Sequence, residues 1–277
     1  MRAENVSQKP KFWILHTLLI VLAFFMLVPF AWMILTSFKS LGESVHVPVI
    51  VFPKSIHWDN YIDVLYTMPF LTFYFNTIAI TALKVLGTLI FSSLAAYAFA
   101  RIEFPGRNVL FVILISVLMV PGQIYILPLF LIMRDFGWLN TLQAVAVPGM
   151  FDAFGVFLLR QFFLSLMKEL EESAKLDGCN HLQIYWRIML PLAKPGLIAL
   201  TIFTVLASWN ELLWPMIVNS SPAKMTLAVG LSWLQGRHGT NYPVLMAGSL
   251  MALWPMVLLF LTLQKHFIEG IAMTGTK

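Results

Sequence analysis

The sequence predicts an all-α integral membrane protein with six transmembrane helices. Its 277 residues are 59% hydrophobic and 11% charged, with a mean hydropathy of +0.82, which is too apolar for a soluble domain. The apolar residues form long runs with short polar segments between them. About 20 such residues cross a bilayer as a helix, in which every backbone polar group is satisfied internally. We therefore expect residues 1–277 to form one transmembrane domain.

Six apolar runs correspond to the six expected helices. They cover residues 13–36, 72–99, 109–132, 142–164, 195–218 and 243–264. The first run follows basic residues, as a secretory signal does. It is too long for a signal core and has no small-residue cleavage site, so an uncleaved span is expected. Pro121-Gly122 and Pro128 interrupt the third run and predict a bend or an unwound turn. The proline-containing polar segment 41–71 is expected to stay outside the bilayer.

The distribution of basic residues predicts that both termini are cytoplasmic. With the N-terminus inside, the two tails and the 100–108 and 160–194 loops hold twelve Lys and Arg, against five on the opposite side. Cytoplasmic loops carry such an excess. The formal charge of +5 is therefore attributed to membrane topology and not to nucleic-acid binding.

The polar segment 165–195 is expected to lie on the cytoplasmic side as well. Its apolar residues recur at helical spacing: Leu166, Leu170, Ala174, Leu182, Trp186 and Met189. This spacing predicts two amphipathic helices. Gly178 divides them and permits the positive φ that ends a helix, and Pro191 ends the second. Such a hairpin could insert into a groove on a partner protein or lie on lipid headgroups.

The segment also contains a motif. Glu172-Ser173-Ala174-Lys175-Leu176-Asp177-Gly178 is followed after nine residues by Ile188-Met189-Leu190-Pro191. This pattern resembles the E-A-A-x-x-D-G-x(9)-I-x-L-P loop of the membrane subunits of ABC importers, with Ser173 where alanine is usual. The resemblance implies that the loop couples the spans to a separate ATP-hydrolysing subunit. The coupling residues would be Glu172, Ser173, Ala174, Asp177, Gly178, Ile188, Leu190 and Pro191.

Further segments extend the resemblance over nearly the whole chain. They are Thr36-Ser37-Phe38-Lys39, Trp58-x-Asn60-Tyr61, Asn76-Thr77, Ala95-Ala96-Tyr97-Ala98-Phe99-Ala100-Arg101, Phe104-Pro105-Gly106-Arg107, Trp209-Asn210-Glu211 and Trp214-Pro215. Together they resemble the carbohydrate-uptake class of ABC importer permeases, and in particular the second permease of a heterodimer of the multiple-sugar, raffinose or maltose type.

That resemblance implies a type I ABC importer permease fold in the bacterial cell membrane. The expected partners are a second permease subunit, two ATPase subunits and an extracellular sugar-binding protein. ATP and Mg would bind to the ATPase, and this chain would carry no cofactor. The cargo would be an oligosaccharide, with a raffinose-like sugar as one candidate.

Few ionisable residues lie at membrane depth, among them Lys84, Asp152 and Glu211. Charges at this depth need a partner, a bundle interior or water. Lys84 and Asp152 would lie about 18 Å and 15 Å from the outer ends of their spans, so the two could form an ion pair. Polar contacts between helices are the favoured explanation for Lys84 and Asp152. For Glu211 a sugar path is favoured, because polar groups beside aromatic rings suit one. The candidate path residues are Asn76, Asp152, Trp209, Asn210, Glu211 and Trp214.

The sequence argues against catalysis on this chain. It has no Gly-x4-Gly-Lys-Ser/Thr or Gly-x-Gly-x-x-Gly phosphate signature, no cluster with metal-ligand spacing and no convergent catalytic set, so no catalytic or metal residue is expected. The alternative is a secondary transporter that couples a polar solute to an ion. Asp152 and Glu211 are candidate coupling carboxylates for it, but no internal repeat is visible.

Overall fold

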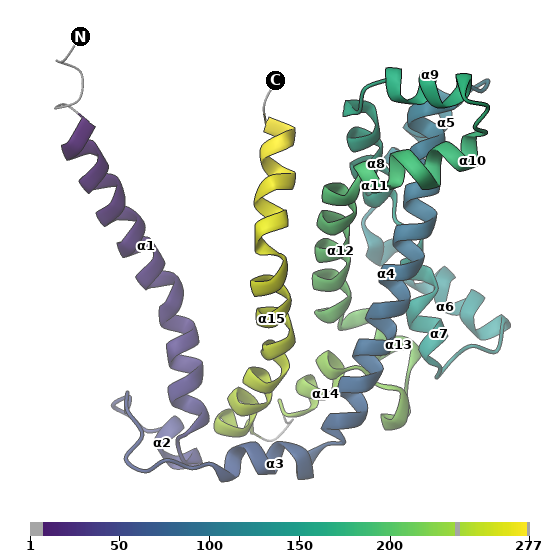
Figure 1. The fold of residues 1–277 in the computed structure, drawn as a ribbon. Helices are drawn as coiled ribbons and strands as arrows, with labels where there is room; N and C mark the ends of the chain where they lie inside the picture. Colours follow the sequence, from purple (N-terminus) through teal and green to yellow (C-terminus); the bar gives the residue numbers. More distant parts are fainter. Residues whose placement is uncertain (1–7, 236–238, 276–277) are drawn as a thin grey trace. The chain divides into compact units, whose positions relative to one another are not determined.

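The computed structural model describes residues 8–235 and 239–275, which form helices and connecting loops (Figure 1). The chain divides into two compact units, Met1–Met68 with Leu231–Leu253 and Pro69–Gly230 with Trp254–Lys277. The extreme ends that were expected to be cytoplasmic, residues 1–7 and 276–277, lie outside the described residues.

The first unit begins with a long apolar helix, α1 (Gln8–Ser37), followed by α2 (Leu41–Ser44) and α3 (Asp59–Thr67). The apolar stretch Phe12–Ser37 is long enough to cross a membrane. None of its most hydrophobic 18-residue segment is buried against the rest of the chain. A helix that is apolar on all sides and unburied is suited to contact with lipid or with other membrane helices.

Hydrogen bonds shape the loop after α1. Ser40 caps α2 in a capping box with Glu43, whose carboxylate accepts from the backbone N–H groups of Ser40 and Lys54, each at 3.0 Å. These bonds hold the pKa of Glu43 below its ordinary value, and the bond from the Ser40 backbone has the largest effect. The buried Asn60 amide donates to the carbonyls of Ser37 and Lys39 at 2.8 and 2.9 Å. The loop is thereby tied to the ends of α1 and α3.

The second unit is built around α4. Its helices up to the hairpin are α4 (Phe70–Arg101), α5 (Arg107–Ser116), η1 (Val117–Met119), η2 (Gly122–Tyr125), α6 (Ile126–Asp135), α7 (Leu142–Ala146), η3 (Pro148–Met150) and α8 (Ala153–Ser165). Those that follow are α9 (Glu169–Leu176), α10 (His181–Ile184), the π-helical turn η4 (Tyr185–Met189), α11 (Leu190–Leu192), α12 (Lys194–Trp209), α13 (Leu213–Val218) and η5 (Pro222–Lys224). Two further helices, α14 (Leu227–Trp233) and α15 (Tyr242–Gly275), contain residues of both units.

Small residues let α4, α8 and α12 pack closely, side by side (Figure 1). A Cβ atom added at Gly155 of α8 would lie 2.8 Å from Ser92 Oγ on α4 and 3.0 Å from a Leu200 methyl carbon on α12. Small residues at such contacts are typical of membrane helix packing. The core at this junction includes the fully buried Leu159, Phe163 and Leu200.

Four helical segments of the described chain are long and apolar enough to span a membrane, and up to six if each of two bent pairs counts as one span. One pair, Arg107–Met119 with Gly122–Asp135, is bent by 93°, which confirms the break predicted at Pro121-Gly122. Two further breaks were not predicted. One lies at residues 151–152, between η3 and α8, and the other at residues 210–212, between α12 and α13.

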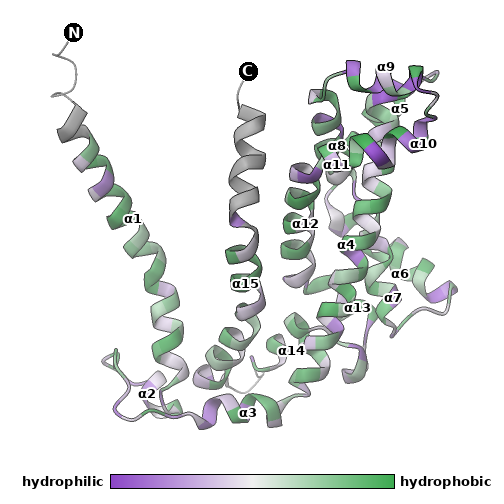
Figure 2. Cartoon of the chain, in the orientation of Figure 1, coloured by the Kyte–Doolittle hydropathy of each residue, from purple (hydrophilic) through white to green (hydrophobic). Residues whose placement is uncertain are grey.

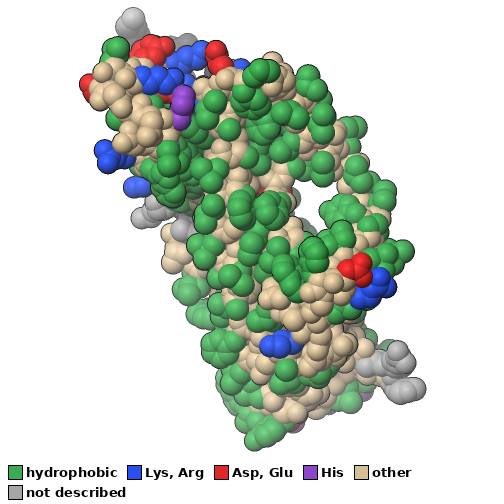
Figure 3. Space-filling view, turned by 90° about the vertical axis from the view of Figure 1, so that its right-hand side faces the viewer, with side chains coloured by type: hydrophobic (Ala, Val, Ile, Leu, Met, Phe, Trp, Pro, Cys, Tyr) green, Lys and Arg blue, Asp and Glu red, His purple; other side chains and the backbone are tan. Residues whose placement is uncertain are grey.

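Polar and apolar residues are distributed unevenly over the second unit. Hydrophobic residues dominate α4, α8 and α12, whereas hydrophilic ones gather on α9 and α10 (Figure 2). The space-filling view shows charged side chains concentrated at the end that carries these short helices, above a mostly apolar flank (Figure 3). This distribution separates a hydrated end from a surface suited to lipid.

Candidate functional site

The segment 165–195 forms a hairpin of short helices. α9 (Glu169–Leu176) is followed by Gly178 and then by α10, which continues through the π-helical turn η4 into α11. Asn180 begins α10 in a capping box with Gln183. Pro191 cannot donate a backbone hydrogen bond, and the helix just before it is wound as π. The two helices expected here are therefore present, although the second is irregular.

Gly178 ends α9 with a Schellman motif. The Cys179 N–H donates to the Ala174 carbonyl and the Gly178 N–H to the Lys175 carbonyl, both at 3.0 Å. Gly178 has φ +82°, which is the left-handed conformation that this motif requires and that glycine adopts without strain. The positive φ expected at this residue is confirmed.

The hairpin is attached to α4 at two points. Arg101, at the C-terminal end of α4, donates to the carbonyl oxygens of Phe163 and Leu166, and its Nε lies 3.9 Å from the buried Glu171 carboxylate. Ser93 and the Tyr185 hydroxyl form a 2.7 Å hydrogen bond. A displacement of the hairpin would therefore pull directly on α4.

The apolar residues that the spacing placed on one face of the second helix are divided in the structure. Tyr185 packs against Tyr97 with ring centroids 5.4 Å apart, and this contact turns Tyr185 and Met189 into the core. Leu182 and Trp186 share the predicted spacing with Met189, but they are 60% and 53% exposed. They form part of the outer surface of the hairpin instead.

The motif residues divide between this outer surface and the core. Glu172, Ser173, Asp177, Gly178 and Pro191 are exposed, Ala174 is buried, and Ile188 and Leu190 are half-buried. Leu176, within the motif, is 89% exposed. The outer surface of the hairpin thus presents acidic and apolar groups together.

A second feature is a pair of adjoining cavities of about 560 and 260 Å³ inside the second unit. Both are lined by Lys84, Glu211, Tyr125 and the Pro148-Gly149 pair. The larger one is also lined by Thr88, Phe151, Asp152, Phe154, Phe203, Thr204, Ala207 and Ser208. Its volume falls in the range of about 300–1,000 Å³ that is usual for small-molecule sites.

A polar stripe on α4 forms one wall of this region. Its members are Thr77, Thr81, Lys84, Thr88 and Ser92, spaced three or four residues apart, so they share one helix face. Thr81 bonds to Ser208 on α12, and Thr88 and Ser92 donate to the carbonyls of Gly149 and Asp152. This stripe was not predicted from the sequence, although its helical spacing is visible there within an apolar run.

Lys84 forms an ion pair with Glu211 and not with Asp152, which corrects the pairing expected from depth alone. The Lys84 ammonium also donates a hydrogen bond to the Glu211 carboxylate, and the two side chains are 7% and 30% exposed. Glu211 can reach Lys84 because it lies in the break after α12, where the chain leaves the helix. The C-terminal end of α12 adds partial negative charge that also favours the ammonium.

Asp152 has a different role at the same cavity. It is the N-cap of α8, and its carboxylate accepts from the N–H groups of Phe154 and Gly155 at 3.1 and 3.0 Å. These bonds explain why it does not turn toward Lys84. An acidic residue is favourable at a helix N-terminus.

The candidate path residues do not all meet at the cavities. Asp152, Glu211 and Trp214 line them. Trp209 is buried edge-on to Tyr74 with ring centroids 5.9 Å apart, and the Asn210 amide donates to the Leu206 carbonyl. Trp214 also donates its ring N–H to the Ala144 carbonyl.

Asn76 is held in a structural contact. Its amide donates to the carbonyls of Ala223 and Met225 at 3.0 and 2.9 Å. We expect Asn76→Asp to lower thermal stability more than Asn76→Ala, because a carboxylate would oppose both carbonyls. Thermal unfolding of the purified protein measures both losses, and an unchanged melting temperature for Asn76→Asp would contradict the structural role of this contact.

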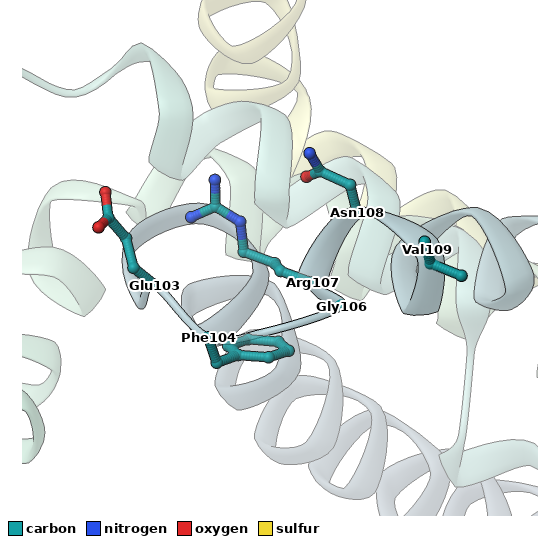
Figure 4. A pocket seen from close by; sticks show the side chains of 6 residues that line it. All are labelled: Glu103, Phe104, Gly106, Arg107, Asn108 and Val109. Atoms are coloured by element: carbon teal, nitrogen blue, oxygen red, sulfur yellow. The ribbon is translucent and has the colours of Figure 1, made fainter.

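A further hollow lies in the loop between α4 and α5. It is lined by Glu103, Phe104, Gly106, Arg107, Asn108 and Val109. The side chains of Glu103, Arg107 and Asn108 point to the same side of it (Figure 4). The Arg107 guanidinium donates to the Ile102 carbonyl, and Gly106 starts α5 at φ +78°. The hollow therefore holds one acidic and one basic side chain, Glu103 and Arg107. The Arg107 hydrogen bond and the positive φ of Gly106 explain the Phe104–Arg107 motif as a turn that joins α4 to α5.

Within residues 8–235 and 239–275, no group of three or more His, Cys, Asp or Glu side chains could hold a metal ion. Two features of the described chain stand out: the hairpin 165–195 and a polar cavity among its apolar helices.

Comparisons with known proteins place the chain among transport components. Residues 88–272 match the family described as "Binding-protein-dependent transport system inner membrane component". An arabinooligosaccharide transport system permease protein of Halalkalibacterium halodurans is 37% identical over 96% of each chain. Its Bacillus subtilis counterpart is 36% identical over 93% of this chain and 92% of its own. Among solved structures, a bacterial ABC transporter involved in the import of the acidic polysaccharide alginate matches with TM-score 0.82 and 28% identity, covering 96% of this chain and all of that one.

Proposed function

Since the chain belongs to the family of binding-protein-dependent transport system inner membrane components, we propose that it forms half of the sugar path in an ATP-driven importer. The chain is a multi-pass membrane permease of an ABC importer, and its family consists of transport components and not of enzymes. The single observation that carries the proposal is the hairpin 165–195, an exposed acidic and apolar surface fastened to the central helix α4.

The sequence of this chain has no phosphate-binding signature for ATP, so the importer needs partner subunits. ATP and Mg would bind to two separate ATPase subunits, onto which the hairpin docks. A second, different permease would complete the path, and an extracellular binding protein would deliver the cargo. Both termini and the hairpin would then lie in the cytoplasm, where the excess of Lys and Arg belongs.

The cargo class we infer is an oligosaccharide. The two curated relatives described above are named as arabinooligosaccharide permeases, and the cavity combines hydroxyl, charged and aromatic groups. The ion-coupled alternative is less well supported, because Glu211 is paired with Lys84 and Asp152 caps α8. Neither carboxylate is left free to bind a coupling ion.

ATP hydrolysis would be coupled to transport by a rigid-body motion of the hairpin. ATP binding would bring the ATPase subunits together, and the hairpin would move with them. Its contacts with α4, from Leu166 and Glu171 to Arg101 and from Tyr185 to Ser93, would pass that motion to the core of α4, α8 and α12. Rigid-body motion of packed elements is a common route for such switching.

The test is a substitution at Gly178. We expect Gly178→Val to insert normally and to retain ATP hydrolysis, but to reduce uptake at least about tenfold, because a β-branched residue at φ +82° costs about 1–3 kcal/mol and would distort the hairpin. Its Cβ would meet no other atom within 4 Å, so the effect comes from the backbone. ATP hydrolysis and sugar uptake are measured on the same proteoliposomes.

Gly178→Asn is the matched control, because asparagine tolerates the left-handed conformation best among other residues. It should retain most uptake. Normal uptake by Gly178→Val would contradict the coupling role of this hairpin.

A further inference from the structure

Three breaks in the helices of the second unit meet at one place. The first break separates η1 from η2 and ends just before Gly122. The second is the segment Pro148–Asp152, and the third is the break at residues 210–212, which holds Glu211. Residues of all three line the adjoining cavities. Non-helical backbone at membrane depth is tolerated only where it is buried in protein or borders water. The three breaks therefore border a shared polar space within the second unit.

The walls of the larger cavity have the chemistry that a sugar ring needs. The rings of Phe154 and Phe203 lie at 88° to each other with centroids 5.6 Å apart, and both side chains are partly exposed, at 37% and 40%. Thr88, Thr204 and Ser208 supply hydroxyl groups on the same walls. Apolar faces with a few polar groups are the usual composition of a small-molecule site, and hydroxyls both donate and accept hydrogen bonds.

The charges at the cavities sum to −1. Lys84 contributes one positive charge, and Glu211 and Asp152 contribute one negative charge each. No other charged residue is among the described residues that line either cavity. Lys84 is already neutralised by Glu211, so it offers little attraction to an anion. A carboxylate brought into this cavity would be repelled by Asp152.

We propose that this cavity is a subsite of this chain for one neutral glycosyl unit of the cargo, with Phe154 and Phe203 as the sugar-facing rings. The charge of Asp152 would disfavour acidic sugars there. The inference rests on the proposed function, which supplies the oligosaccharide, and adds that this chain contacts the sugar and selects against negative charge.

The experiment uses the assembled importer in nanodiscs without its binding protein, so that only the membrane complex can bind sugar. The probes are arabinotriose, raffinose and maltotriose as neutral sugars and trigalacturonate as the acidic one. Saturation-transfer NMR measures binding, and proteoliposome uptake with the binding protein identifies which neutral probes are transported. We expect a transported neutral probe to bind, and Phe154→Ala/Phe203→Ala to weaken that binding at least about fivefold.

Two further variants sharpen the test. Phe75→Ala removes an exposed ring of α4 that does not line the cavities, and it should leave binding unchanged. Asp152→Asn retains a good N-cap but removes the charge, so it should strengthen trigalacturonate binding about fivefold on a Coulomb estimate.

The outcomes separate the two claims. If no probe is taken up with ATP, the proposed function fails. If a neutral probe is transported but does not bind the membrane complex, or binds equally well to Phe154→Ala/Phe203→Ala, the subsite is refuted. Equal trigalacturonate binding by wild type and Asp152→Asn would refute the charge selection. Loss of binding in Phe75→Ala as well would show that the ring substitutions act through stability, and would also overturn the assignment.

Discussion

Replacing Glu211 with leucine should destabilise the complex more than replacing Lys84 with methionine. The Lys84 side chain is 7% exposed and the Glu211 side chain 30%. Removing Glu211 leaves an uncompensated buried ammonium, at a cost of about 3–5 kcal/mol. Removing Lys84 leaves a carboxylate that still reaches solvent, at a smaller cost of about 1–3 kcal/mol. Thermal unfolding of the purified complex measures both losses.

A double-mutant cycle isolates the pair. Lys84→Met/Glu211→Leu should lose clearly less stability than the sum of the single losses, by about 0.5–3 kcal/mol. Lys84→Met/Asp152→Leu is the matched control, and its losses should add, because Asp152 bonds to the N-terminus of α8 instead. Additive losses for Lys84 and Glu211 would contradict the ion pair.

Replacing Arg101 with methionine should both destabilise the complex and uncouple it. The Arg101 side chain is 4% exposed, bonds to two carbonyls and lies against Glu171. Hydrogen bonds to charged groups contribute about 1.5–3 kcal/mol each, so a total loss of about 3 kcal/mol or more is expected. Arg101→Lys should recover only part of it, because an ammonium cannot reproduce the guanidinium fork.

The readout for Arg101 is the ratio of sugar taken up to ATP hydrolysed, measured beside thermal stability. Arg107→Met is the control, because Arg107 bonds only to the Ile102 carbonyl among its described hydrogen bonds. It should leave the ratio unchanged. Equal ratios for Arg101→Met and Arg107→Met would remove Arg101 from the coupling path.

The local features of the hairpin could be predicted from the sequence. Gly178 between two amphipathic stretches predicted a helix end with positive φ, because only local backbone geometry is involved. The family resemblance drawn from the motifs was confirmed as well. Which face of the second helix packs could not be predicted, because it depends on Tyr185 reaching Ser93, 92 positions earlier in the chain.

The cavity was harder to predict for a related reason. Depth along two spans placed Lys84 and Asp152 at similar levels, but depth does not say which helices are neighbours. The true partner, Glu211, lies in a break at residues 210–212 that hydropathy does not reveal. The polar stripe on α4 was available from its spacing, whereas the meeting of three helix breaks depends on tertiary structure.

We propose that this chain forms half of a sugar path that is driven by a separate ATPase. The most direct measurement is sugar uptake by the co-purified complex in proteoliposomes, with and without ATP, and with the ATPase subunits stripped away. We expect uptake of a neutral oligosaccharide that requires ATP, the ATPase subunits and the binding protein, and that persists when proton and sodium gradients are collapsed. Uptake by the stripped membrane subunits, driven by an ion gradient alone, would contradict the claim.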